Sequence, residues 1–204
     1  GGTLTFGVDW RRADIRTVEG SEAESPLGIG ATIELGRTGE RHGLALKVPG
    51  RHNLSNALAA LAAAHAAGVP LADAVQALGD YAGLARRFDV VGTSPGGVTV
   101  IDDFGHNPEK VAATLATLKA HPGRVIAFFQ PHGYGPLRQM GAGLAEVLAT
   151  RLGAEDQTIL CDPVYFGGTV DRSVGSERIV SLIRAHGGMA EHIPDRADCA
   201  ARMV

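Results

Sequence analysis

A polar cluster follows the apolar, β-branched run at residues 98–102. Asp102 is the last residue of this run and Asp103 follows it directly. His106 and Pro108 come within a few residues. In an open α/β sheet, ligands bind outside the carboxyl ends of the strands. The carboxylates could hold a metal ion or accept hydrogen bonds from ribose hydroxyls. Adjacent strand residues point to opposite faces, so we expect them to share one ligand only if the chain turns there. The alternative for His106 is that it caps the following helix.

A second cluster lies between an expected strand and an expected helix, at residues 50–56 (GRHNLSN). His52 or Asn53 would stand at the helix start, where unpaired backbone N–H groups favour anions. Asn53 and Asn56 are three residues apart and therefore share a helix face. Each amide offers a donor and an acceptor, which suits the edge of a purine. The alternative is that Asn53 only caps the helix and His52 packs in a loop.

Two loops follow later apolar runs and would lie at the same sheet edge if the strands are parallel. The first covers residues 130–138 (QPHGYGPLR), in which His132 and Arg138 are candidate anion binders. The second covers residues 162–168. The pair Arg86-Arg87 could clamp a phosphate or ribose, or could be solvated surface.

Several other chemistries lack their sequence signature. The chain contains no G-x-x-x-x-G-K-[ST] loop and no Cys/His metal spacing. We therefore expect no metal site formed by this chain alone and no triphosphate-gripping loop.

The elements that must position these residues form two patterns. The first part is rich in short β-type runs, followed by an Ala- and Leu-rich helix and a second helix. The expected strands are 3–8, 14–18, 29–35 and 43–48, and the expected helices are 53–67 and one beginning at Pro70 or Leu71. The second part alternates between strands and helices. Its expected strands are 98–102, 124–129, 157–161 and 191–193, and its expected helices are 108–120, 137–151 and 176–186.

This alternation predicts an α/β fold, with right-handed βαβ units and a mainly parallel sheet in the second part. We place a boundary near residues 84–87.

The chain has 204 residues, of which 45% are hydrophobic and 20% are charged, and its net charge is −3. This composition favours no nucleic-acid or anionic-membrane partner. No apolar run approaches membrane-spanning length, and the N-terminus lacks the basic region of a signal peptide, so we expect a cytoplasmic protein with two reduced cysteines.

Four motifs, in this order along the chain, resemble those of the Mur ligase family. They are Gly50-Arg-His-Asn-Leu-Ser-Asn56, Arg87-Phe88, Ile101-Asp-Asp-Phe-Gly-His106 and Phe129-Gln-Pro-His-Gly-Tyr134. The resemblance implies that residues 1–85 are the end of a central P-loop ATPase domain, namely its β-strands and helical pair. It implies that residues 86–204 are a Rossmann-like C-terminal domain without its last strand.

The resemblance also implies an activity: ATP phosphorylates a carboxylate, and the amine of an amino acid attacks the acyl phosphate. The carboxylate would belong to a UDP-N-acetylmuramate-type substrate in peptidoglycan precursor synthesis. The fragment would be inactive alone, and Mg²⁺ would be held mostly by the absent P-loop part. The expected partners are ATP, an amino acid and a UDP-sugar-type substrate, with no nucleic acid and no membrane, in a monomer or weak homodimer.

By the same resemblance, five residues would bind the nucleotide. Asn53 and Asn56 would lie at the nucleotide, with Asn56 at the adenine, and His52 would lie near the phosphates. Arg87 and Asp103 would bind from the C-terminal domain, with Asp103 at the ribose.

Four further residues would serve the amino-acid and acyl-phosphate end. His106 and His132 would be catalytic there, while Phe104 and Arg138 would contact substrate. The sequence departs from the family pattern here, because Gly133 and Pro136 stand where arginines usually contact substrate carboxylates. This departure leaves open a related ligase with a non-muramyl substrate, and the missing P-loop leaves open a non-catalytic nucleotide-binding module.

Overall fold

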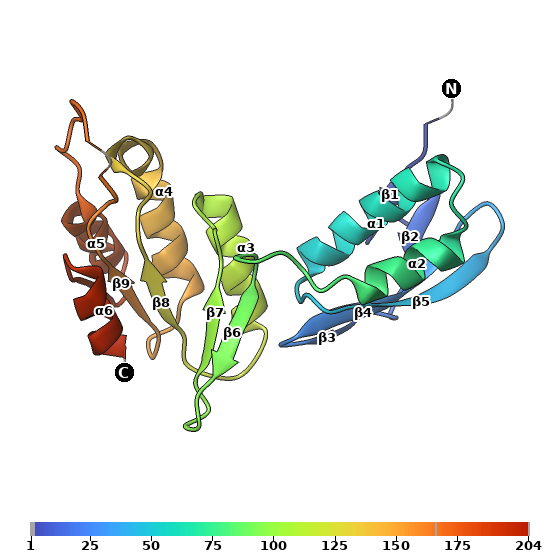
Figure 1. The fold of residues 1–204 in the computed structure, drawn as a ribbon, viewed down its shortest axis with the longest axis horizontal. Coiled ribbons are helices and arrows are strands. Elements are labelled where there is room, and N and C mark those ends of the chain that lie inside the picture. Colours follow the sequence, from blue (N-terminus) through green and yellow to red (C-terminus); the bar gives the residue numbers. More distant parts are fainter. Residues whose placement is uncertain (1–2, 166, 204) are drawn as a thin grey trace. The chain divides into compact units, whose positions relative to one another are not determined.

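The structure is a computed structural model that describes residues 3–165 and 167–203. The chain forms two compact units, residues 1–104 and residues 105–204, and the elements of both are labelled in Figure 1. Each unit has its own hydrophobic core. The domain boundary expected between residues 85 and 86 concerns the family's domain division, and it stays a prediction. Within the described residues, no helix combines the length and apolar character that crossing a bilayer requires.

The first unit is built on a sheet whose central strand is β4 (Gly28–Leu35). Along one edge β4 pairs antiparallel with β2 (Ile15–Thr17) and β3 (Ala23–Ser25), and along the other with β5 (Glu40–Leu46). A short β1 (Phe6–Gly7) pairs parallel with β2. The β-type runs of the sequence are therefore confirmed as strands, although β1 is shorter than expected and β3 was not predicted.

Two helices, α1 (Arg51–Ala66) and α2 (Leu71–Asp80), pack on this sheet (Figure 1). Three leucines of α1 at helical spacing, Leu54, Leu58 and Leu61, are completely buried in the core. Burial of a leucine side chain contributes roughly 1.5–3 kcal/mol. The apolar stripe therefore fixes which face of α1 turns away from solvent, and with it the exposed face that carries Asn56.

A hairpin follows, formed by β6 (Asp89–Thr93) and β7 (Thr99–Asp102). The two strands are antiparallel, with Asp89 opposite Asp102 and an irregularity between Val90 and Gly92. The strand at 98–102 was predicted, whereas β6 was not, because its sequence DVVGT has no clear alternation and contains a glycine. The antiparallel pairing of β7 also differs from the parallel arrangement that the alternating pattern favoured.

The second unit contains a parallel sheet of three strands in the order β10-β9-β8, as expected from the alternating pattern. The strands are β8 (Ile126–Phe129), β9 (Gln157–Leu160) and β10 (Ala190–His192). The helices are α3 (Pro108–Lys119), α4 (Tyr134–Arg151), α5 (Ser176–Ala185) and α6 (Arg196–Met203). Such βαβ connections place helices on the faces of the sheet.

Side chains of β9 alternate between two cores. Leu160 packs into the larger core with α3, α4 and α5, whereas Ile159 and Cys161 pack with Cys199 of α6. Strand residues point alternately to opposite faces, so the helices cover both sides of β9. Helix α6 was not predicted. Helix α4 begins at Tyr134, three residues before the expected start, after a glycine cap with φ of 120°.

Candidate functional site

Helix α1 begins inside the GRHNLSN motif. Its N-cap is Gly50, with φ of 98°, and no side chain caps the helix. The helix starts at Arg51, so neither His52 nor Asn53 is the cap that the sequence suggested. Instead, the Asn53 amide donates a hydrogen bond to the carbonyl of Pro49 at 2.7 Å. The capping interpretation of Asn53 is therefore wrong, while Asn56 lies exposed on the helix.

Arg51 connects the start of α1 to loops of the sheet. Its guanidinium donates to the carboxylate of Asp9 at 2.9 Å and to that of Glu22 at 2.7 Å. Two carboxylates around one planar guanidinium form an extended charge-assisted network. The network ties the start of α1 to the loops that carry Asp9 and Glu22, and it leaves Arg51 engaged within the protein.

His52 lies in the first turn of α1, and its imidazole interacts electrostatically with the carboxylate of Asp103, the residue after β7. Partial desolvation lowers the pKa of His52, and the negative charges of Asp103 and Glu24 act in the opposite direction. The lowered pKa favours the neutral imidazole at pH 7. The structure therefore brings His52 and Asp103, from two separate motifs, into one electrostatic environment within the first unit.

The two carboxylates at the end of β7 have different partners. Asp103 Oδ2 accepts a hydrogen bond from the Phe88 backbone N–H at 2.9 Å. Asp102 Oδ2 lies 3.4 Å from Arg86 Nε. The two adjacent carboxylates therefore have different partners within the protein, and the expectation that they do not share one ligand stays a prediction.

The Arg86-Arg87 segment is held against the residues that follow β7. The Arg86 guanidinium lies 4.8 Å from the Phe104 ring centroid, and the Phe104 N–H donates to the Arg86 carbonyl at 2.9 Å. Arg86 and Phe88 both have positive φ, at 61° and 51°, which is uncommon for residues other than glycine. Arg87 lies between them, with its side chain exposed.

The second unit carries both candidate catalytic histidines. His106 precedes Asn107, which caps α3 by accepting the Lys110 N–H at 2.9 Å, so His106 is not the cap. His132 follows β8 and is exposed, as is His106. The Pro131 carbonyl accepts the Val164 N–H at 3.0 Å, which ties the loop after β8 to the loop after β9. Phe166, in the second loop, lies outside the described residues.

Arg138 lies on α4, one turn after Tyr134, rather than in the expected loop. Its guanidinium pairs with Asp171 at 2.5 Å. The Arg172 guanidinium lies over the ring of Tyr165, 3.8 Å from its centroid, and 5.8 Å from that of Tyr134. Sequence reasoning identified the 162–168 loop but missed Asp171 and Arg172, which follow it by a few residues.

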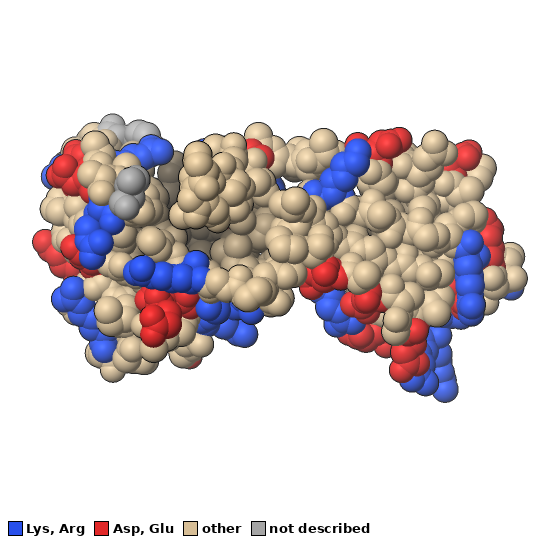
Figure 2. All heavy atoms as spheres, turned by 90° about the horizontal axis from the view of Figure 1, so that it is seen from below, with Lys and Arg blue, Asp and Glu red and all other residues tan. Residues whose placement is uncertain are grey.

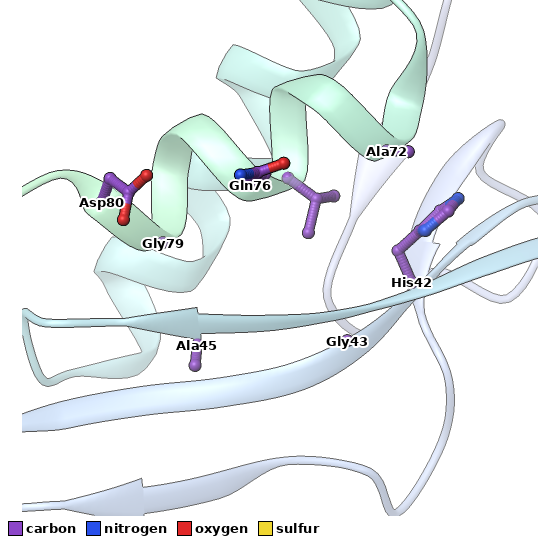
Figure 3. A pocket seen from close by; sticks show the side chains of 8 residues that line it. His42, Gly43, Ala45, Ala72, Gln76, Gly79 and Asp80 are labelled. Atoms are coloured by element: carbon purple, nitrogen blue, oxygen red, sulfur yellow. The ribbon is translucent and has the colours of Figure 1, made fainter.

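A separate hollow of about 430 Å³ lies between β5 and α2 (Figure 3). Its wall includes the small residues Gly43, Ala45, Ala72 and Gly79, and His42 at its rim pairs with Glu40 at 2.7 Å. None of the predicted site residues lines this hollow. We assign no function to it.

The described residues form no metal-binding cluster. Within 3–165 and 167–203, no group of three or more His, Cys, Asp or Glu side chains is arranged to hold a metal ion. We therefore assign no residue of this chain to Mg²⁺.

On the face seen in Figure 2, basic and acidic side chains are interspersed rather than gathered into one large patch of a single sign.

The second unit is an α/β unit with a parallel sheet, and it follows an antiparallel sheet with two helices and a hairpin. Residues 86–204 match the family described as "Mur ligase, glutamate ligase domain". The chain is 39% identical to UDP-N-acetylmuramate–L-alanine ligase of Agrobacterium fabrum over 164 residues, covering 79% of this chain and 34% of that protein. It is 35% identical to the ligase of that name from a Bradyrhizobium species, covering 97% of this chain and 42% of that protein. The chain therefore belongs to the Mur ligase family.

A solved structure is similar over nearly the whole chain. The crystal structure of UDP-N-acetylmuramate-alanine ligase from Thermotoga maritima matches with a TM-score of 0.71 at 27% identity, covering 95% of this chain and 40% of that one. The chain thus spans between 34% and 42% of the length of these relatives.

Proposed function

We propose that this chain is the C-terminal part of an ATP-dependent ligase that joins an amino acid to the carboxylate of a UDP-N-acetylmuramate-type substrate. The observation that carries the proposal is the match of residues 86–204 to the Mur ligase family, in a chain that also carries the GRHNLSN motif at residues 50–56. Family membership and the names of the relatives support the reaction class.

The proposed reaction has two steps. The γ-phosphoryl group of ATP passes to a substrate carboxylate oxygen, which releases ADP and forms an acyl phosphate. The amino group of the amino acid then attacks the acyl carbon, the C–O bond to phosphate breaks, and inorganic phosphate leaves with the bond electrons. The amine loses a proton, and an amide remains. Both steps depend mostly on positioning and on stabilisation of charge.

The residues of the first unit would bind the nucleotide. Asn56 is exposed on α1 and offers both a donor and an acceptor to the adenine edge. Asp103 would accept a ribose hydroxyl with the oxygen not used by Phe88. His52 and Arg87 would lie near the phosphates, where Arg87 offers several N–H donors. Asn53 would hold the motif in shape through its bond to Pro49.

Four residues would act at the acyl phosphate and the amine. His106 and His132, each beside a helix start, would stabilise the developing negative charge or take the amine proton. Phe104 would pack against substrate, and Arg138 would contact it while paired with Asp171. We place this enzyme in the cytoplasm, where its nucleotide substrates are made, and expect a monomer or weak homodimer.

The test uses the complete ligase that contains this chain. Purified enzyme with ATP, Mg²⁺ and UDP-N-acetylmuramate should release phosphate only when a suitable amino acid from a panel is added. Hydroxylamine in place of the amino acid should trap the acyl phosphate as a hydroxamate. Absence of amino-acid-dependent phosphate release with every acceptor would favour the non-catalytic nucleotide-binding module.

A second acceptor class has one specific observation in its favour. Gly133 and Pro136, in the cap and first turn of α4, carry no charge with which to bind an acceptor carboxylate. A panel that replaces UDP-N-acetylmuramate with non-nucleotide peptide carboxylates tests this alternative. Faster turnover with such an acceptor would replace the muramyl assignment while keeping the ligase class.

A further inference from the structure

One arginine of the second unit contacts two aromatic rings. The Arg172 guanidinium carbon lies 3.8 Å from the ring centroid of Tyr165 and 5.8 Å from that of Tyr134. The Tyr165 hydroxyl donates to the Gly168 carbonyl at 2.7 Å, which fixes the orientation of that ring. Because Tyr134 begins α4 and Tyr165 follows β9, two separate elements position a single cation.

The nearest acidic neighbour in the sequence is already engaged elsewhere. Asp171 pairs with Arg138 at 2.5 Å and accepts the Ser173 N–H at 2.9 Å. Within residues 3–165 and 167–203, no carboxylate lies at ion-pair distance from Arg172, although its side chain is exposed. A guanidinium carries five N–H donors, so its contact with the aromatic rings leaves donors for an oxyanion.

Arg172 contacts residues at the carboxyl ends of the parallel strands, the edge at which α/β folds bind ligands. Tyr134 and Tyr165 follow the carboxyl ends of the parallel strands β8 and β9. The Val164-to-Pro131 hydrogen bond, at 3.0 Å, joins the two loops at this edge. Ligands of open α/β sheets bind outside the carboxyl ends of the strands.

Resting on the proposed function, we propose that Arg172 binds the α-carboxylate of the incoming amino acid and is a specificity-determining residue of the ligase. The α-carboxylate takes no part in amide formation, so a fixed cation can hold it throughout the reaction. A planar guanidinium binds a carboxylate through two parallel N–H bonds, which also orients the neighbouring amino group. The site therefore selects an amino acid over an amine or an amino-acid amide.

The test compares an amino acid with its carboxamide in the complete ligase. Wild type, Arg172→Gln and Arg172→Lys are assayed with L-alanine and L-alaninamide, or with whichever amino acid the panel selects and its carboxamide. Arg172→Gln should raise KM for the amino acid about tenfold or more, the loss typical of a charged bidentate contact. It should leave KM for ATP and turnover of the carboxamide unchanged. Arg172→Lys should give an intermediate effect. Lysine keeps the positive charge but cannot bind a carboxylate through two parallel N–H bonds.

Two controls separate a binding role from a structural one. Arg178→Gln, on the exposed surface of α5, removes the same charge from the same unit and should change no kinetic parameter. Tyr165→Leu should reproduce part of the Arg172→Gln effect, and Tyr165→Phe should have a smaller effect, because it keeps the ring and loses only the bond to Gly168. If Arg172→Gln keeps the wild-type preference for the amino acid over its carboxamide, the assignment of Arg172 is overturned and the ligase function stands. If wild type shows no amino-acid-dependent phosphate release, the proposed function fails as well.

Discussion

The Asp103 carboxylate accepts the backbone N–H of Phe88 at 2.9 Å, which connects the end of β7 to the segment before β6. Phe88 has φ of 51° and is buried, so this bond holds a backbone conformation that a phenylalanine rarely adopts. The same contact fixes Asp103 in the position from which we propose that it binds ribose. Asp103 therefore serves both the local backbone and the proposed nucleotide site.

This double role gives a prediction for Asp103→Asn. The amide oxygen can still accept the Phe88 N–H, but the charge and one acceptor are lost. Because a hydrogen bond to a charged group contributes about 1.5–3 kcal/mol, KM for ATP should rise roughly tenfold or more in the complete ligase. Asp103→Ala should raise it further and also lower the unfolding temperature. Steady-state kinetics with ATP as the varied substrate measure the effect.

The matched control is Asp102→Asn. Its carboxylate faces Arg86 at 3.4 Å, and we give it no contact with the nucleotide. KM for ATP should stay close to the wild-type value in this variant. If both substitutions raise KM for ATP equally, the end of β7 affects ATP binding only through its structure. That result would contradict the ribose assignment of Asp103.

Asn56→Ala separates binding from stability. Alanine has the higher helix propensity, by roughly 0.5 kcal/mol, and Asn56 is exposed on α1, so the free energy of unfolding should stay the same or increase slightly. KM for ATP should nevertheless rise, because the amide would contact the adenine. Ser55→Ala, one position earlier on the same helix, should leave KM for ATP unchanged. An Asn56→Ala enzyme with wild-type ATP kinetics removes this residue from the site.

Asp156 should control the acid stability of the second unit. The residue is only 2% exposed, and its carboxylate accepts N–H groups of Val125 and Gly153, both at 2.7 Å, and lies 2.8 Å from Lys119 Nζ. Desolvation is the largest influence and raises the pKa of Asp156, but the hydrogen bond from Lys119 and the two backbone bonds together lower it below the ordinary value. A lowered pKa means that the stabilisation is present above the unfolded-state pKa and is lost as pH falls through the folded-state value.

Asp156→Ala should therefore reduce the free energy of unfolding by about 3 kcal/mol at pH 7, since it leaves buried donors unpaired. The difference from wild type should shrink at an acidic pH below the lowered folded-state pKa of Asp156, where the wild-type carboxylate is protonated. Denaturant unfolding at both pH values measures it. Glu155→Ala, at the exposed neighbouring position, should have little effect at either pH. A difference that does not depend on pH would contradict the role of the carboxylate charge.

The two cysteines should be unreactive in the folded protein. Cys161 and Cys199 are free thiols with no exposed surface. Burial raises the pKa of Cys161 to about 11, and burial also raises the pKa of Cys199. At pH 8 only about one Cys161 thiol in a thousand is therefore ionised, and the thiolate is the reactive form. A chromogenic disulfide reagent should modify both thiols quickly in guanidinium and neither at a comparable rate in native buffer. Rapid native labelling would contradict the packing of α6 against β9.

The sequence determined the elements whose periodicity is strong. The leucines of α1 repeat at helical spacing, and the alternation of strands and helices after residue 105 gave the parallel sheet of the second unit, because both patterns report local geometry. Weak local signals failed: β6 carries a glycine without alternation, and α4 begins before its proline, at Tyr134. The capping interpretations of Asn53 and His106 also failed, because Gly50 and Asn107 take those positions.

By itself, then, the sequence determined the fold class of the second unit, the family and the short motifs, since each depends on residues close together in the chain. Only the tertiary structure decided which partners those residues have. Asp103 reaches Phe88 from 15 positions away, and Arg138 reaches Asp171 from 33 positions away. It also placed Arg172 over Tyr165 and Tyr134, two residues that no local pattern connects with it. Such pairings depend on how distant segments pack, and the burial and charge that come with them are not properties of any one segment.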